Sequence, residues 1–143
     1  MLKNVYEILN EIESVQTDQQ RKQILEQNNN HYFTQVLKYV FDPNYQFYVE
    51  DFPTEYIKPD TAPGIRFAGI ESEIRRTYLF IKGDPTADSL SDEKRKVLLL
   101  QLLESFEPEE AIVFVNMMKK DLKTTGLTET LVRETFPTLL PTT

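Results

Sequence analysis

The sequence contains no cysteine, only one histidine, His31, and only four glycines. Without cysteine there is no disulfide bond, no thiol nucleophile and no thiolate metal ligand, and this composition fits a reducing intracellular compartment. One histidine without cysteines or clustered carboxylates does not make a zinc site. We therefore interpret His31 as a structural or surface residue and expect no bound metal.

Long apolar runs and an amino-terminal targeting signal are also absent. The amino terminus, MLKNVYEILNEIE, carries acids throughout and lacks the apolar centre of a signal peptide. Apolar runs such as residues 97–100 are far shorter than the roughly 20 residues that span a bilayer. We expect a soluble, cytoplasmic protein with no membrane partner.

Phosphate-binding and catalytic motifs are missing as well. The sequence has no glycine-rich nucleotide loop and no Walker lysine motif. No set of nucleophile, base and oxyanion donors can be named. Adjacent acids such as Glu109 and Glu110 are interpreted as a solvated face or the first turn of a helix. We predict a protein that is not an enzyme and binds no cofactor.

Acidic residues outnumber basic ones. The chain has 23 Asp and Glu against 16 Lys and Arg, a net charge of −7. Nucleic-acid binding normally requires a basic face, so this balance favours a protein partner or simple solubility. A net charge of −7 is still compatible with a local basic patch.

What the sequence does contain is a set of helical patterns. Apolar residues recur at steps of three and four along most of the chain, as in helices with one buried face. The hydrophobic content of 40% is enough for a core in a chain of 143 residues. We predict one all-α domain over residues 1–143, a compact bundle of about six or seven helices. A proline- and aromatic-rich ordered connector is expected near residues 43–68, with a short extended piece at 45–49.

Helix starts are predicted from capping residues. The expected caps are Thr17 or Asp18, Ser89 or Ser91, and Thr128. Residues 69–82 are predicted to be helical, and Gly83-Asp84-Pro85 is predicted to end that helix. The side chains that this helix is expected to bury in the core are Ile70, Ile74, Tyr78 and Ile81. The next helix is expected to bury Val97, Leu98, Leu102 and Leu103.

A basic cluster lies at the end of a helix that is predicted to begin at Pro108. Lys119, Lys120 and Lys123 are expected in its last turn, before a turn at Gly126 and a new helix near residue 128. One interpretation is an anion site, formed by these lysines and the N–H groups of the last helix. The other is that the lysines only complement the dipole of the helix end and stay solvated.

Residues 116–127, NMMKKDLKTTGL, resemble a signature near the end of the N-terminal DNA-binding domain of ATP-dependent DNA ligases, most closely those of T-even-like phages. Residues 5–12 and 22–28 look like the opening of those ligases. Residues 41–49 and 137–141 are similar to their aromatic turn and to the segment that leads toward their catalytic domain. The chain has no adenylation motif, and it carries Glu50 and Asp51 where the phage ligases are basic.

This resemblance implies a non-catalytic helical module that grips the backbone of nicked or double-stranded DNA with little sequence preference. The predicted DNA-binding residues are Lys119, Lys120, Lys123, Thr125, Gly126, Arg66, Arg75 and Arg76. The chain is then either one domain of a longer ligase or, the interpretation we favour, a free-standing relative from a phage or cyanophage, acting in the cytoplasm of an infected bacterial cell. The alternative is an acidic adaptor that uses the same scaffold to bind a phage or host protein.

Overall fold

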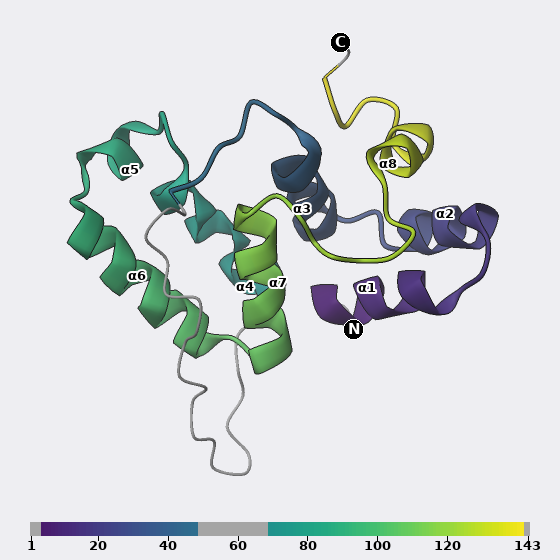
Figure 1. The fold of residues 1–143 in the computed structure, drawn as a ribbon, viewed down its shortest axis with the longest axis horizontal. Helices are drawn as coiled ribbons and strands as arrows, with labels where there is room; N and C mark the ends of the chain where they lie inside the picture. The colour runs from purple at the N-terminus through teal and green to yellow at the C-terminus, as the bar shows by residue number, and fades with distance from the viewer. Residues whose placement is uncertain (1–3, 49–68, 142–143) are drawn as a thin grey trace.

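The computed structural model describes residues 4–48 and 69–141, and this part of the chain is all-α, as predicted (Figure 1). It forms eight α-helices and one 3₁₀ helix, more elements than expected because two of the helices are very short. In chain order they are α1 (Val5–Ser14), α2 (Asp18–Gln27), α3 (His31–Phe41), α4 (Ile70–Glu73), η1 (Ile74–Phe80), α5 (Pro85–Ser89), α6 (Asp92–Ser105), α7 (Pro108–Met118) and α8 (Glu129–Thr135). Most of the predicted connector lies outside the described residues.

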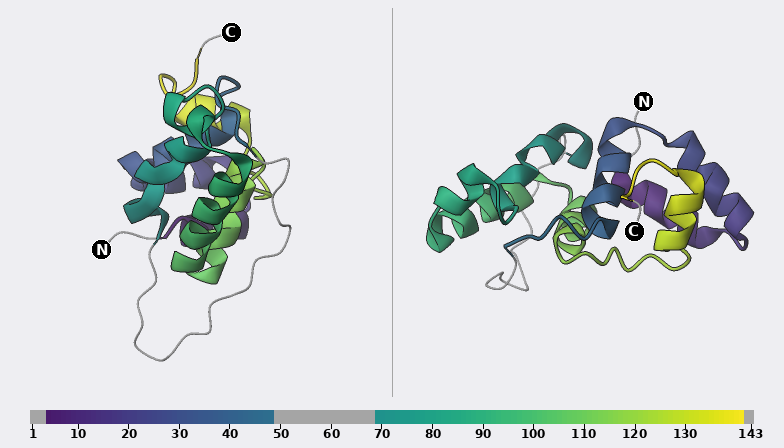
Figure 2. Two further views of the ribbon diagram at one scale, coloured as in Figure 1. Left: turned by 90° about the vertical axis from the view of Figure 1, so that its left-hand side faces the viewer. Right: turned by 90° about the horizontal axis from the view of Figure 1, so that it is seen from above.

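Helix α7 occupies the middle of the fold (Figure 1). It contacts α1, α3 and α6. Helices α1, α2, α3 and α8 gather on one side of it, while η1, α5 and α6 gather on the other (Figure 2). One hydrophobic cluster runs through both sides and includes four fully buried rings, Phe33, Phe80, Phe106 and Phe114. Within the described part of the chain, no helix has the length and apolar character needed to cross a membrane.

The predicted capping residues are confirmed at the starts of three helices. The side chains of Thr17, Ser91 and Thr128 each accept a hydrogen bond from a backbone N–H three residues later, which closes the starts of α2, α6 and α8. A hydroxyl in this position satisfies one of the N–H groups that a helix start leaves unpaired. The three helices therefore begin where their sequences indicate.

The segment 69–82 departs from its predicted α-helix. After one turn of α-helix, α4, the chain continues as the 3₁₀ helix η1. A 3₁₀ helix has three residues per turn, so the buried positions are Ile74, Thr77 and Phe80. Tyr78, which was predicted to point inward, is 43% exposed. An isolated antiparallel bridge between Phe47 and Ile81 joins the end of this segment to the chain after α3.

The inner face of α6 is also rotated from the prediction. Leu102 and Leu103 are buried as expected, but Leu99 is buried in place of Val97, which is 48% exposed. Arg95 is buried on the same face, four residues before Leu99, and its guanidinium points inward. It donates hydrogen bonds to the carbonyls of Ala87 and Leu90 at the end of α5, a short helix that the sequence pattern did not predict.

The greatest departure is Glu110. It lies in the first turn of α7, one of the two places predicted for it, but it is fully buried rather than solvated. Its Oε1 accepts the N–H of Tyr6 at 2.8 Å, and its Oε2 accepts the N–H of Ile70 at 2.9 Å. These N–H groups belong to the first turns of α1 and α4, where helices leave donors unpaired. Burial raises the pKa of the Glu110 carboxyl, and its hydrogen bonds from the backbone oppose that shift. Glu110 thus joins α7 to two helix starts.

Replacing Glu110 with Gln tests this role. An amide keeps one acceptor but places its NH₂ group against a backbone N–H, so one buried donor loses its partner. We expect E110Q to lower the free energy of unfolding by about 1–3 kcal/mol. The matched variant E109Q changes an exposed neighbour and should stay within about 0.5 kcal/mol of the wild type. Urea denaturation followed by circular dichroism measures both, and equal stability of the two variants would contradict this role.

Candidate functional site

Most of the predicted site residues lie in the lysine loop, residues 119–128, which connects α7 to α8. The prediction that α7 continues through Lys123 is wrong, because the helix ends at Met118. Lys120 adopts a φ of 62°, and the N–H groups of Lys120 and Asp121 bond to the carbonyls of Met117 and Asn116 at 3.0 Å each. This is the left-handed helix ending in which glycine is the usual residue.

The side chain of Lys120 explains why a lysine occupies this position. Its Nζ donates hydrogen bonds to the carbonyls of Tyr39, Asp42 and Tyr45, each at 2.7 Å. Tyr39 lies in the last turn of α3 and Asp42 is its C-cap. The carbonyl of Tyr39 is one that a helix end leaves without a partner, whereas that of Asp42 also accepts the N–H of Tyr45. A cation there also complements the helix dipole.

This geometry changes the role predicted for Lys120. An ammonium group has three donors, and all three point to backbone carbonyls, so none is left for a phosphate. Burial lowers the pKa of Lys120, and the charge of Asp42 opposes that shift. We therefore assign Lys120 to the fold and leave it out of the proposed phosphate contacts.

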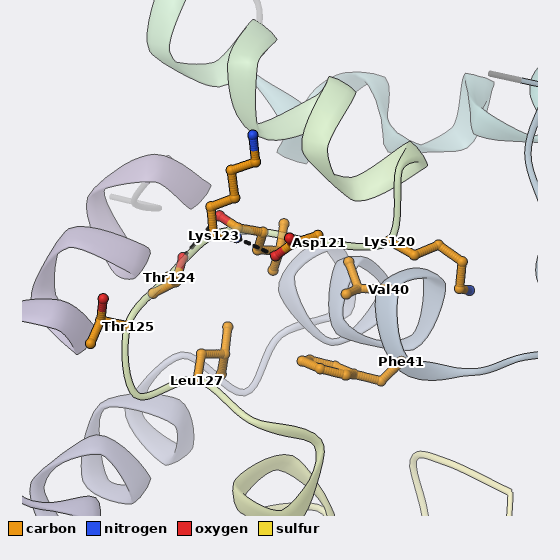
Figure 3. A pocket seen from close by; sticks show the side chains of 9 residues that line it. Val40, Phe41, Lys120, Asp121, Lys123, Thr124, Thr125 and Leu127 are labelled. Atoms are coloured by element: carbon orange, nitrogen blue, oxygen red, sulfur yellow. Dashed lines mark hydrogen bonds between the residues drawn. The ribbon is translucent and has the colours of Figure 1, made fainter. Parts of the chain in front are cut away.

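Lys119 and Lys123 differ from Lys120 because their side chains are exposed. Among the described residues, neither has a carboxylate within ion-pair distance. The backbone at Lys123 is fixed, since its φ is 54° and its N–H donates to Oδ1 of Asp121 at 2.9 Å. Figure 3 shows the side chains of Lys120 and Lys123 leaving the loop in different directions. The structure thus presents two exposed ammonium groups on a loop of fixed shape.

Gly126, another predicted phosphate contact, has a structural reason to be glycine. Its φ is 89°, and a Cβ atom built there would lie 2.2 Å from Nε of Arg21. Arg21 in turn donates to the carbonyls of Ile12 and Val15 at the end of α1. The loop therefore passes directly over an arginine that closes α1. A larger residue at position 126 would have to adopt a positive φ and displace the Arg21 guanidinium.

A pocket of about 330 Å³ lies beside the lysine loop (Figure 3). Phe41 and Leu127 face each other across it and supply an apolar side. The loop supplies a polar side that includes Lys123, Thr124 and Thr125. The pocket therefore offers loop hydroxyl groups next to apolar surface, while the side chain of Lys123 extends from the loop away from Phe41 and Leu127 (Figure 3).

The predicted arginines do not join this pocket. Arg75 and Arg76 are exposed on η1, where Arg76 pairs with Glu73 at 3.1 Å, and neither lines the pocket. Arg66 lies outside the described residues. The structure thus brings Lys119, Lys123 and Thr125 together in one loop but not with Arg75 and Arg76. In the described part of the chain, no group of three His, Cys, Asp or Glu residues is placed to hold a metal ion.

The separate roles of the neighbouring lysines can be measured. We expect K120M to lower the free energy of unfolding by about 2–3 kcal/mol, because three carbonyls lose a charged donor. K119M removes an exposed charge and should change it by no more than about 0.5 kcal/mol. Urea denaturation distinguishes them, and a K120M protein as stable as K119M would show that the contacts to α3 contribute nothing.

Comparison with known proteins identifies the family of this chain. A search of curated proteins finds no significant match. Residues 8–124 match a family of unknown function (DUF6433), a range that covers α2 to α7, most of α1 and the start of the lysine loop. Because the match extends over far more than half of the chain, the protein belongs to the family DUF6433.

Proposed function

We propose that this chain is a non-catalytic module that binds the sugar–phosphate backbone of nicked or double-stranded DNA through the lysine loop. The observation that supports it is that the lysines of the loop have different roles. Lys120 and Asp121 fix the shape of the loop from within, while Lys119 and Lys123 stay exposed. A loop that is already ordered loses less conformational freedom when it binds.

The chemistry of the pocket fits a backbone ligand. Lysine ammonium groups act as point charges toward phosphate oxygens. The hydroxyl of Thr125 can donate to a phosphate, and the apolar side formed by Phe41 and Leu127 suits a deoxyribose. None of these contacts reads a base edge, so the proposal includes no sequence preference. The resemblance of residues 116–127 to the ligase signature supports the same ligand.

Charge reversal in the loop tests this proposal. We expect K119E/K123E to abolish retention of a nicked duplex in a fluorescence anisotropy titration. The single reversals should each weaken binding and make log K less dependent on log salt, by about 0.9 per lost phosphate contact. The control K94E/K96E makes the same charge change at two exposed lysines of α6 and should bind as the wild type does. Equal losses in both double variants, or no loss in either, would contradict a site at the loop.

A second candidate function is binding of a partner protein, as in the adaptor interpretation. Two observations favour it. The net charge is −7, and the large apolar side chain of Ile112 on α7 is 51% exposed. Exposed apolar surface next to polar residues is typical of protein contact sites. A phage or host partner, and an infected cell as the setting, remain predictions.

Nuclease treatment separates the two functions. For an adaptor, we expect a tagged chain to retain a stoichiometric protein from a cell lysate after DNA and RNA have been digested. For a DNA module, retained proteins are lost with the nucleic acid, because they are held through it. Mass spectrometry of the eluate with and without nuclease distinguishes these outcomes.

A further inference from the structure

A second pocket, of about 220 Å³, lies in the corner between α1 and α7, where the lysine loop closes a third side. Each helix presents four residues at the i, i+3, i+4, i+7 spacing of a single helix face. They are Tyr6, Leu9, Asn10 and Glu13 from α1, and Glu109, Ile112, Val113 and Asn116 from α7. We call this site the corner pocket.

The corner pocket has an apolar floor and an exposed apolar edge. Leu9, Val113 and Leu122 are 4%, 7% and 7% exposed and form the floor. Ile112 on its edge is 51% exposed, the highest value among the exposed large apolar side chains of the described residues. Ile112 therefore continues the apolar floor out to the surface, and an exposed apolar surface rimmed by polar residues is typical of a contact site.

The size and charge of the corner pocket restrict its occupant. Its volume is below the roughly 300–1,000 Å³ of small-molecule sites, so it suits one anchoring side chain rather than a cofactor. Glu13 and Glu109 line it, and among the described residues neither is ion-paired. Two carboxylates against the single ammonium of Lys123 repel a phosphate backbone and attract a basic segment.

We propose that the corner pocket binds a segment of a partner protein in which a large apolar side chain is flanked by lysine or arginine. The apolar side chain fills the floor against Leu9 and Val113 and covers Ile112. The basic residues pair with Glu13 and Glu109, and the side-chain amides of Asn10 and Asn116 are available to the segment's backbone. This inference deepens the second candidate function by naming its site, and it does not depend on DNA binding.

The test uses two capped peptides of defined sequence, KRFLK and its acidic counterpart EDFLE. We expect KRFLK to cause saturable amide shifts in ¹⁵N–¹H spectra that cluster on Asn10, Glu13, Ile112 and Asn116, and EDFLE to cause none. I112D should weaken the binding of KRFLK at least about tenfold, as for a central interface residue. The control V97D changes a side chain of similar exposure on α6 and should leave the affinity within about twofold of the wild type.

Charge reversal gives an independent readout. E13K/E109K should weaken binding of KRFLK and favour EDFLE. The control E26K/E104K makes the same net charge change at two exposed acids elsewhere and should preserve the preference for KRFLK. The proposal is overturned if KRFLK produces no saturable shifts, if the shifts map to α6, or if the controls lose binding equally. It is also overturned if sedimentation shows a wild-type dimer that I112D converts to a monomer, because the occupant is then a second copy. A nuclease-resistant partner without peptide binding would retain the adaptor function and reject this site.

Discussion

The two ends of α7 bind the ends of other helices, and the elements on both sides of it depend on these contacts. At its start, the carboxylate of Glu110 accepts N–H groups from the first turns of α1 and α4. Just past its end, the ammonium of Lys120 binds the last carbonyls of α3 and the carbonyl of Tyr45. Buried helix ends need partners because water does not reach them, and a charged group offers the strongest available bond. The hydrophobic cluster supplies bulk stabilisation, while these two charges fix which helix end lies where.

Charged side chains also bind helix ends away from α7, and these contacts explain why the fold needs few glycines. Arg21 binds carbonyls at the end of α1, and Arg95 binds those at the end of α5. Each of these cations satisfies carbonyls at a helix end, which the backbone hydrogen bonds of a glycine turn often do. Their charge is thereby directed into the protein, and it adds nothing to an external basic face. Any anion site in the described part of the chain depends on lysines that the fold does not use, which is why Lys119 and Lys123 carry the proposed contacts with DNA.

How much of this could be predicted depended on the distance between partners along the chain. The caps at Thr17 and Thr128 were predictable because donor and acceptor lie three residues apart. The partners of Lys120 and Glu110 lie 40 to 104 residues away, and no local spacing indicates them. Tyr78 was misplaced because the 3₁₀ period and the α period diverge within two turns. For the candidate site, sequence indicated the loop and its exposed lysines, but it could not distinguish the lysine that supports the loop from those it presents.

The central position of α7 in space contrasts with its late position in the chain. When the protein is synthesised, α1, α3 and α4 leave the ribosome before Glu110 and Lys120 exist, so their ends stay hydrated until α7 emerges. Each contact then closes a loop of many tens of residues, which slows the search for the native arrangement. A chain interrupted between α6 and α7 contains most of the helices but neither of the charges that join them. In this protein, the helix ends that α7 joins therefore find their partners only after α7 itself has been synthesised.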